Sequence, residues 1–302
     1  MTTKQYAALL YILITSILIQ VKSHAQTLVS DTLIESKSQS QLSEMIPMIQ
    51  HGADAHKIQY LTQDINGQES IASGLIVVPS SNSCSWSLTS YLHGTVTKKE
   101  DVPSRLNSEA TIGYYAAAII GSVVALPDYL GLGDSPGFHP YIHSKTEASA
   151  SLDMLRATKE FCEKHSIYLN DDLFLFGYSQ GGHSTLALQK LIEEEASEEF
   201  KIKYSIPMSG PYDLSGVQTE MFTGRGDYPS PFYLPYLVLS YHSLYPELNK
   251  YDLDSLFISP YDSLLPIYFD GYHDSDQIDL IMPNNPVEIF NPDFYNEFLS
   301  DS

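Results

Sequence analysis

The chain has 302 residues, of which 43% are hydrophobic and 18% charged, so it can bury a substantial core and does not have the composition of a disordered protein. It carries 37 acidic residues against 16 basic ones, a formal net charge of −21. This charge argues against non-specific binding to nucleic acid or to an anionic membrane surface, because both need basic patches. Two cysteines, Cys84 and Cys162, are too few for a disulfide framework or a cysteine-based zinc site, and the sequence does not decide whether they pair.

The first residues are typical of a targeting segment. Lys4 precedes an apolar run from Ala7 to Val21, which is short for a transmembrane helix, and Ser23-His24-Ala25 offers small residues before Gln26. We therefore expect residues 1–25 to be a cleaved signal peptide and the protein to be secreted or periplasmic, with no stable membrane span after cleavage. The alternative is an uncleaved membrane anchor.

The remaining chain reads as alternating strands and helices. Residues 27–50 predict a short helix, and residues 57–63 and 70–79 predict two strands joined by the turn pair Asn66-Gly67. Further strands are expected over 88–92, 122–126, 173–176 and 203–208, and helices over 104–121, 147–164 and 181–195. Short apolar strands alternating with helices predict an α/β fold, in which a mostly parallel, twisted sheet is covered by helices on both faces.

The rhythm stops near Tyr212. The following residues are rich in Pro, Tyr, Leu and Ser, and 11 of the 22 tyrosines lie between Tyr204 and Tyr272. We expect a core over residues 26–211 and a mostly helical cap insertion, or lid, over 212–302 that also contains the start of a further part of the core.

The pentapeptide Gly177-Tyr178-Ser179-Gln180-Gly181 has the pattern G-x-S-x-G. It follows a predicted strand and opens a predicted helix, which is the context that a nucleophile elbow requires. Gly177 and Gly181 would leave room for backbone that packs closely against the turn. Ser179 is therefore the candidate catalytic nucleophile; the alternative is a glycine-rich turn with an incidental serine.

The candidate oxyanion hole combines two backbone segments. Gln180 follows the nucleophile at a helix N-terminus, and Gly94 and Thr95 follow the strand that ends at residue 92. Each such N–H donor stabilises the transition state by roughly 2.7–4 kcal/mol. We expect His93 to buttress this loop rather than to act through its imidazole.

Other polar residues favour structural roles. The segment from Asp128 to Ser135 predicts a tight loop in which Asp128 and Asp134 cap or form turns. His139 and His143 are four residues apart, but Pro140 between them argues against the helix that a metal site would need. We expect no metal and no organic cofactor, and we expect His183 to be a packing or capping residue.

Together these motifs resemble the α/β-hydrolase fold and, within it, the secretory lipase family and its bacterial esterase relatives. The resemblance rests on five stretches that span residues 91–214: His93-Gly94-Thr95, Pro127 to Ser135, His139-Pro140-Tyr141, Gly177 to His183, and Ser209 to Leu214. It implies a carboxylic ester hydrolase that acts on small-molecule esters or lipids. A catalytically inactive binding protein with a hydrolase shell, and a serine peptidase or acyltransferase on the same fold, are alternatives.

The sequence does not supply the rest of a catalytic triad. In this fold the chain order is Ser, then Asp or Glu, then His, yet only His183, His242 and His273 follow Ser179. Asp270 could end a strand-like run over 264–269, but His273 follows it too closely for the expected helix and strand. We therefore expect a truncated form with an incomplete sheet, little esterase activity and poor solubility. The alternatives are an inactive hydrolase and an active enzyme with an unusual base such as His273.

Overall fold

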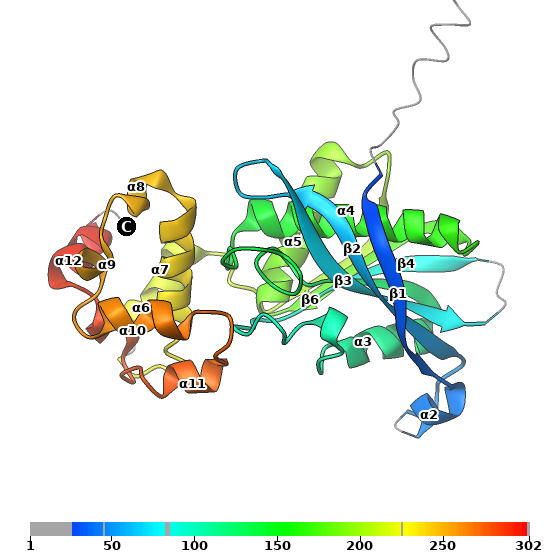
Figure 1. The fold of residues 1–302 in the computed structure, drawn as a ribbon, viewed down its shortest axis with the longest axis horizontal. Coiled ribbons are helices and arrows are strands. Elements are labelled where there is room, and N and C mark those ends of the chain that lie inside the picture. The colour runs from blue at the N-terminus through cyan, green and yellow to red at the C-terminus, as the bar shows by residue number, and fades with distance from the viewer. Residues whose placement is uncertain (1–25, 45, 82–84, 225, 301–302) are drawn as a thin grey trace, which may run out of the picture.

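The computed structural model describes residues 26–44, 46–81, 85–224 and 226–300. The predicted signal peptide, residues 1–25, and Cys84 lie outside the described residues. One sheet with flanking helices stands beside a separate group of helices (Figure 1). Within the described ranges, no helix is both long enough and apolar enough to cross a membrane.

Seven strands form the sheet, in the order β1-β2-β3-β5-β4-β6-β7. Their bounds are β1 (Leu28–Lys37), β2 (Gly52–Gln63), β3 (Glu69–Ser80), β4 (Trp86–Leu92), β5 (Ser122–Pro127), β6 (Leu169–Tyr178) and β7 (Lys201–Met208). The pairs β1–β2, β2–β3 and β3–β5 are antiparallel, whereas β5–β4, β4–β6 and β6–β7 are parallel. The sheet is therefore mixed, whereas the sequence predicts a mostly parallel sheet.

Strand β1 accounts for part of this difference. The helix expected over residues 27–50 is mainly this strand, and among the described residues of that range only α2 (Gln39–Ser43) is helical. Most of β1 is exposed or half-buried because it forms one edge of the sheet, so its sequence lacks the apolar periodicity of a covered strand. The hairpin that follows is confirmed, with Gly67 in the turn at φ 74°.

Helices cover both faces of the sheet, as predicted. On one face lie α4 (Ser144–Lys164) and α5 (Gln180–Glu195). On the other face lie α3 (Ala110–Tyr115) and the π-helical turn η2 (Ala116–Ile120), which continues directly from α3; the short turn η1 (Pro103–Arg105) precedes both. Each face has its own apolar cluster. Cys162 is a free thiol inside the first cluster, and burial raises its pKa to about 12.

Residues 214–300 form a helical body with an apolar cluster of its own, which includes Phe232, Tyr236, Phe257 and Leu265. Its elements are η3 (Leu214–Gln218), α6 (Thr219–Gly224), α7 (Tyr233–Leu244), α8 (Pro246–Asn249), α9 (Leu253–Leu256), α10 (Tyr261–Tyr268), α11 (Ser275–Asp279), η4 (Pro286–Ile289) and α12 (Pro292–Ser300). The prediction of a strand-like run over 264–269 is wrong, because these residues belong mainly to helix α10. Leu265, Tyr261 and Tyr268 of this helix pack in the body's cluster instead of against a sheet, whereas Ile267 is exposed.

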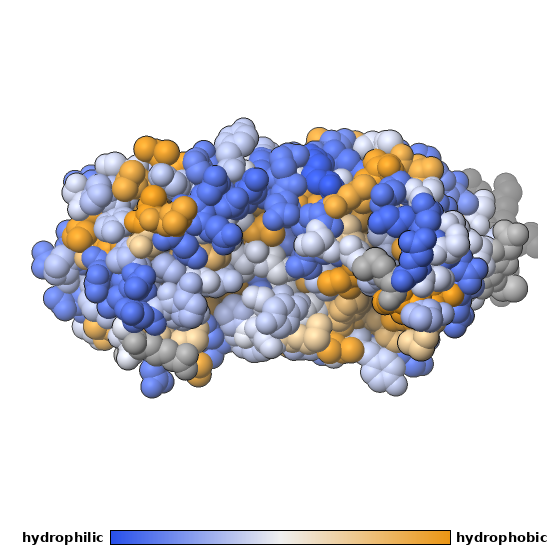
Figure 2. All heavy atoms as spheres, turned by 90° about the horizontal axis from the view of Figure 1, so that it is seen from below, coloured by the Kyte–Doolittle hydropathy of each residue, from blue (hydrophilic) through white to orange (hydrophobic). Residues whose placement is uncertain are grey.

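At the β7 edge of the sheet, side chains are exposed on the face where α3 lies. Tyr204, Ile206 and Met208 of β7 are 64%, 54% and 37% exposed, and no described strand pairs with the free edge of β7. Figure 2 views the molecule from this side and shows patches of apolar surface among the polar atoms.

Candidate active site

Ser179 lies at the sharp turn between β6 and α5. Its backbone has φ 58° and ψ −123°, a conformation that L-residues rarely adopt, and its N–H donates to the carbonyl of Met208 at 3.0 Å. The residue is half-buried, so the turn presents the serine at the surface of the site and does not enclose it. The strand-to-helix context read from the sequence is therefore present in the structure.

The two elbow glycines lie where backbone meets backbone. A Cβ on Gly177 would lie 2.3 Å from the carbonyl oxygen of Gly181, and one on Gly181 would lie 1.8 Å from that of Leu92. Both distances are far inside van der Waals contact, so a side chain at either position would force the turn apart. The glycines allow β4, β6 and α5 to converge at Ser179.

The candidate oxyanion segments meet at this point. Strands β4 and β6 are neighbours with Leu92 opposite Gly177, so the loop after β4 begins beside the elbow. A Cβ on Gly94 would lie 3.7 Å from the carbonyl oxygen of Tyr178, the residue before the nucleophile. The fold thus brings Gly94 close to the elbow and Gln180 directly after Ser179. His93 is fully buried, with Nδ1 2.8 Å from the carbonyl oxygen of Gly94 and Nε2 3.3 Å from that of Asp128.

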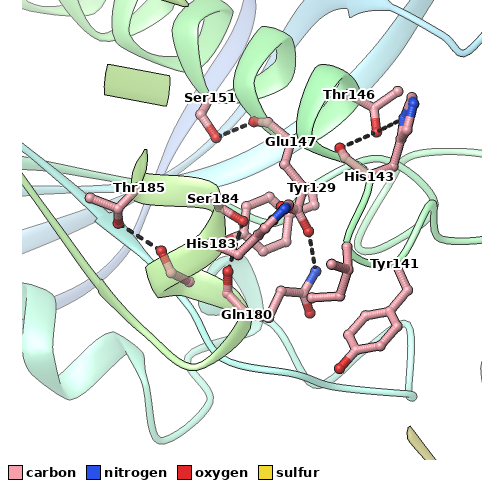
Figure 3. A network of polar contacts seen from close by, with 12 residues as sticks. Tyr129, Tyr141, His143, Thr146, Glu147, Ser151, Gln180, His183, Ser184 and Thr185 are labelled. Carbon is pink, nitrogen blue, oxygen red and sulfur yellow. Dashed lines mark hydrogen bonds and ion pairs between the residues drawn. The ribbon is translucent and has the colours of Figure 1, made fainter. Parts of the chain in front are cut away.

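A buried carboxylate lies beneath the elbow. Glu147 of α4 is 1% exposed; its carboxylate accepts from Gln180 Nε2 at 2.8 Å and from His183 Nδ1 at 2.7 Å (Figure 3). Burial alone would raise the pKa of Glu147, but its interaction with His183 and its hydrogen bonds with Ser184 and Gln180 together outweigh burial, so the pKa lies below its ordinary value. Sequence analysis missed Glu147; a glutamate on the apolar stripe of a predicted helix was the available signal.

Gln180 is held from a second side by His139. The ring Nδ1 of His139 lies 2.7 Å from the carbonyl oxygen of Leu130, so this nitrogen carries the proton and Nε2 accepts from Gln180 Nε2 at 2.7 Å. Burial lowers the pKa of His139 to about 4, which keeps the ring neutral near pH 7. Both amide hydrogens of Gln180 are thus used, while its buried Oε1 has no partner in the described residues.

The three histidines that follow Ser179 lie in different surroundings. His183 is paired with Glu147, His242 Nε2 lies 2.9 Å from the carbonyl oxygen of Tyr251, and His273 Nδ1 lies 3.0 Å from Asp270 Oδ1. In the described ranges no side chain hydrogen-bonds the Ser179 hydroxyl. His139 and His143 have separate partners, and the described residues contain no cluster of three or more His, Cys, Asp or Glu that could hold a metal ion.

A mixed sheet with flanking helices and a serine at a strained strand-to-helix turn define the α/β-hydrolase class. A family model for secretory lipases matches residues 110–200. A candidate hydrolase from Legionella pneumophila is 33% identical, with a TM-score of 0.82 over 91% of this chain and 76% of the other. The chain belongs to the secretory lipase family.

Two further solved structures extend the comparison. The rice cell wall degrading esterase LipA from Xanthomonas oryzae is 26% identical, with a TM-score of 0.78 over 92% of this chain and 76% of the other. Lipase A from Candida antarctica shares the fold, with 16% identity and a TM-score of 0.64 over 92% of this chain and 63% of the other. No curated protein matches the chain.

Proposed function

We propose that the protein hydrolyses carboxylic esters with Ser179 as the nucleophile. Ser179 Oγ attacks the acyl carbon and gives up its proton to a base, and the bond from the acyl carbon to the ester oxygen then breaks as the base returns this proton to that oxygen, so that a neutral alcohol leaves. Water then hydrolyses the acyl-enzyme, which releases the carboxylic acid and restores the serine. The backbone N–H groups of Gln180 and of Gly94 or Thr95 bind the oxyanion.

The conformation of Ser179 carries this proposal. Its φ of 58° and ψ of −123° are costly, and the glycines around it allow the turn only because they lack side chains. A turn that served connection alone would not need this strain. Membership of a lipase and esterase family supports an ester as the substrate.

The helical body supports a preference for apolar esters. It contains a partly open cavity of about 440 Å³ lined mainly by apolar side chains of α6, α7 and α12, among them Phe222, Leu237 and Phe294. We propose that this body is the cap of the enzyme and that its apolar lining favours apolar groups of the substrate; no described residue that lines the cavity belongs to the elbow.

Turnover of p-nitrophenyl butyrate and labelling by a fluorophosphonate test the nucleophile. Whatever turnover and labelling the purified chain shows should be lost in Ser179→Ala, because the phosphonate reacts only with an activated serine. Turnover that persists in Ser179→Ala would contradict the proposal. In a chain that turns over, loss of kcat in His273→Asn would identify the pair with Asp270 as the acid–base unit.

A non-catalytic hydrolase shell is the second candidate. The observation that favours it is that no described side chain hydrogen-bonds the Ser179 hydroxyl, although the elbow itself is intact. Absence of phosphonate labelling in a folded wild-type chain would select this candidate over the enzyme.

A further inference from the structure

The loop that follows β4 is fastened to residues distant in sequence. Tyr236 of α7 donates its hydroxyl to the carbonyl of Val96 at 3.2 Å, and Tyr141 Oη lies 3.1 Å from Thr95 Oγ1. The loop between α10 and α11 adds two bonds: Thr97 Oγ1 donates to the carbonyl of His273 at 2.9 Å, and Lys99 N–H donates to that of Gly271 at 2.8 Å. Residues 95–99 are therefore a main attachment point of the helical body.

The two tyrosines form one rigid unit. Their rings stack with centroids 4.4 Å apart and planes 5° from parallel, and Tyr236 also stacks on Phe269 at 5.0 Å. Tyr141 and Tyr236 are 6% and 2% exposed, so packing fixes both rings and leaves their hydroxyls little freedom.

The adjoining loop has less support of its own. Strand β4 ends at Leu92, so residues 94–97 have left the sheet ladder, which otherwise fixes the backbone. Oxyanion donors are effective only when they are already in place before charge develops, because moving them during the reaction costs free energy. The groups that fix Thr95 and Val96 therefore bear on the oxyanion hole.

We propose that Tyr141, which precedes α4, and Tyr236 of the helical body are positioning residues that hold the oxyanion loop and set the placement of Gly94 and Thr95. This inference rests on the proposed ester hydrolysis for its catalytic consequence. Tyr236 acts through the carbonyl of Val96 and Tyr141 through the hydroxyl of Thr95; neither needs to touch the substrate.

The test compares two phenylalanine variants of the same helix. Tyr236→Phe removes the hydroxyl that holds Val96, whereas the control Tyr241→Phe removes one that donates to the carbonyl of Ile142 at 3.1 Å. One such hydrogen bond contributes a factor of about two to ten in a local equilibrium. We expect amide hydrogen exchange of residues 94–97 to rise by about that factor in Tyr236→Phe and to stay at the wild-type rate in Tyr241→Phe.

Kinetics separate positioning from a general loss of stability. In an active chain we expect Tyr236→Phe to lower kcat on p-nitrophenyl acetate by about two- to tenfold, with KM within about twofold, because a displaced donor affects the transition state more than substrate binding. Tyr141→Phe should act in the same way, which guards against one variant that folds poorly.

Exchange also separates failure of this inference from failure of the proposed function. A folded wild-type chain that does not react with phosphonate refutes ester hydrolysis, and exchange at residues 94–97 still decides whether the tyrosines hold the loop. Unchanged exchange in both Tyr236→Phe and Tyr141→Phe overturns the inference, as does faster exchange with unchanged kcat in an active chain.

Discussion

At the scale of single residues, the site depends on side chains that support the nucleophile from below. Gln180 supplies a candidate oxyanion N–H from its backbone, and its side-chain amide is held by Glu147 and His139. The backbone of Gln180 therefore cannot shift without breaking two buried hydrogen bonds. Glu147 connects this support to α4, one helix away from the elbow.

Replacing Glu147 tests this support. In Glu147→Ala the buried donors of Gln180 and His183 lose their acceptor and a cavity remains, so we expect a loss of about 3–5 kcal/mol in unfolding free energy. Glu147→Gln keeps the shape and should cost less, about 1–3 kcal/mol. Urea unfolding followed by circular dichroism measures both. The control Glu163→Gln changes an exposed residue of the same helix and should cost under about 0.5 kcal/mol; equal losses in Glu147→Ala and in this control would contradict the account.

At the scale of elements, the site exists because β4, β6 and α5 approach without side chains between them. The carbonyl of Leu92 at the end of β4 lies against both elbow glycines. The same contact places the start of the oxyanion loop beside the helix N-terminus. Two conditions of the chemistry, a serine at the surface of the site and nearby N–H donors, therefore follow from one close contact.

Gly181→Ala should disrupt this contact. Its Cβ would overlap the carbonyl of Leu92, and the end of β4 must move to relieve the clash, so we expect a loss of more than about 4 kcal/mol or no folded protein. Gly224→Ala is a matched control, because no described residue outside its own helix backbone and chain neighbours has an atom within 4 Å of its Cβ position; it should be neutral or slightly stabilising. Folded yield and thermal unfolding compare the two. A Gly181→Ala variant as stable as Gly224→Ala would show that the elbow tolerates a side chain.

At the scale of the whole molecule, an ion-pair cluster links segments far apart in the chain. Asp134 accepts from Lys57 Nζ and Gln59 Nε2 of β2 and from Arg105 of η1, at distances of 2.6–3.0 Å. Partial burial would raise the pKa of Asp134, but these hydrogen bonds outweigh it and lower the pKa to about 2. The cluster joins the loop after β5 to strand β2 and to the turn η1.

This pKa predicts how stability depends on pH. An unfolded aspartate titrates near 3.9, so the contribution of Asp134 is complete above that pH and is lost as the pH falls towards 2. The shift corresponds to about 2 kcal/mol. Asp134→Asn should therefore lower the unfolding free energy by about this amount at pH 6 and by little at pH 2, as urea unfolding at the two pH values would show. An equal loss at both would mean that the effect is not ionic.

The elements of the core could be predicted wherever burial leaves a periodic signal. Strands β4 and β5 are buried along their whole length and helices α4 and α5 have one apolar side, so their sequences predict them closely. The sequence does not predict edge strand β1, because side chains exposed on both faces leave no apolar periodicity. It wrongly predicts a strand within helix α10, because a short apolar run has the same sequence signal as a buried strand.

The elbow and the family resemblance can be predicted from the amino-acid sequence alone, because G-x-S-x-G between a strand and a helix is a pattern contained in one short stretch of residues. The partners of that elbow were decided only by tertiary structure. Glu147 lies 36 positions before His183, and Val96 lies 140 positions before Tyr236. No local pattern encodes such contacts, because they form only when packing of the sheet, its helices and the helical body brings the segments together.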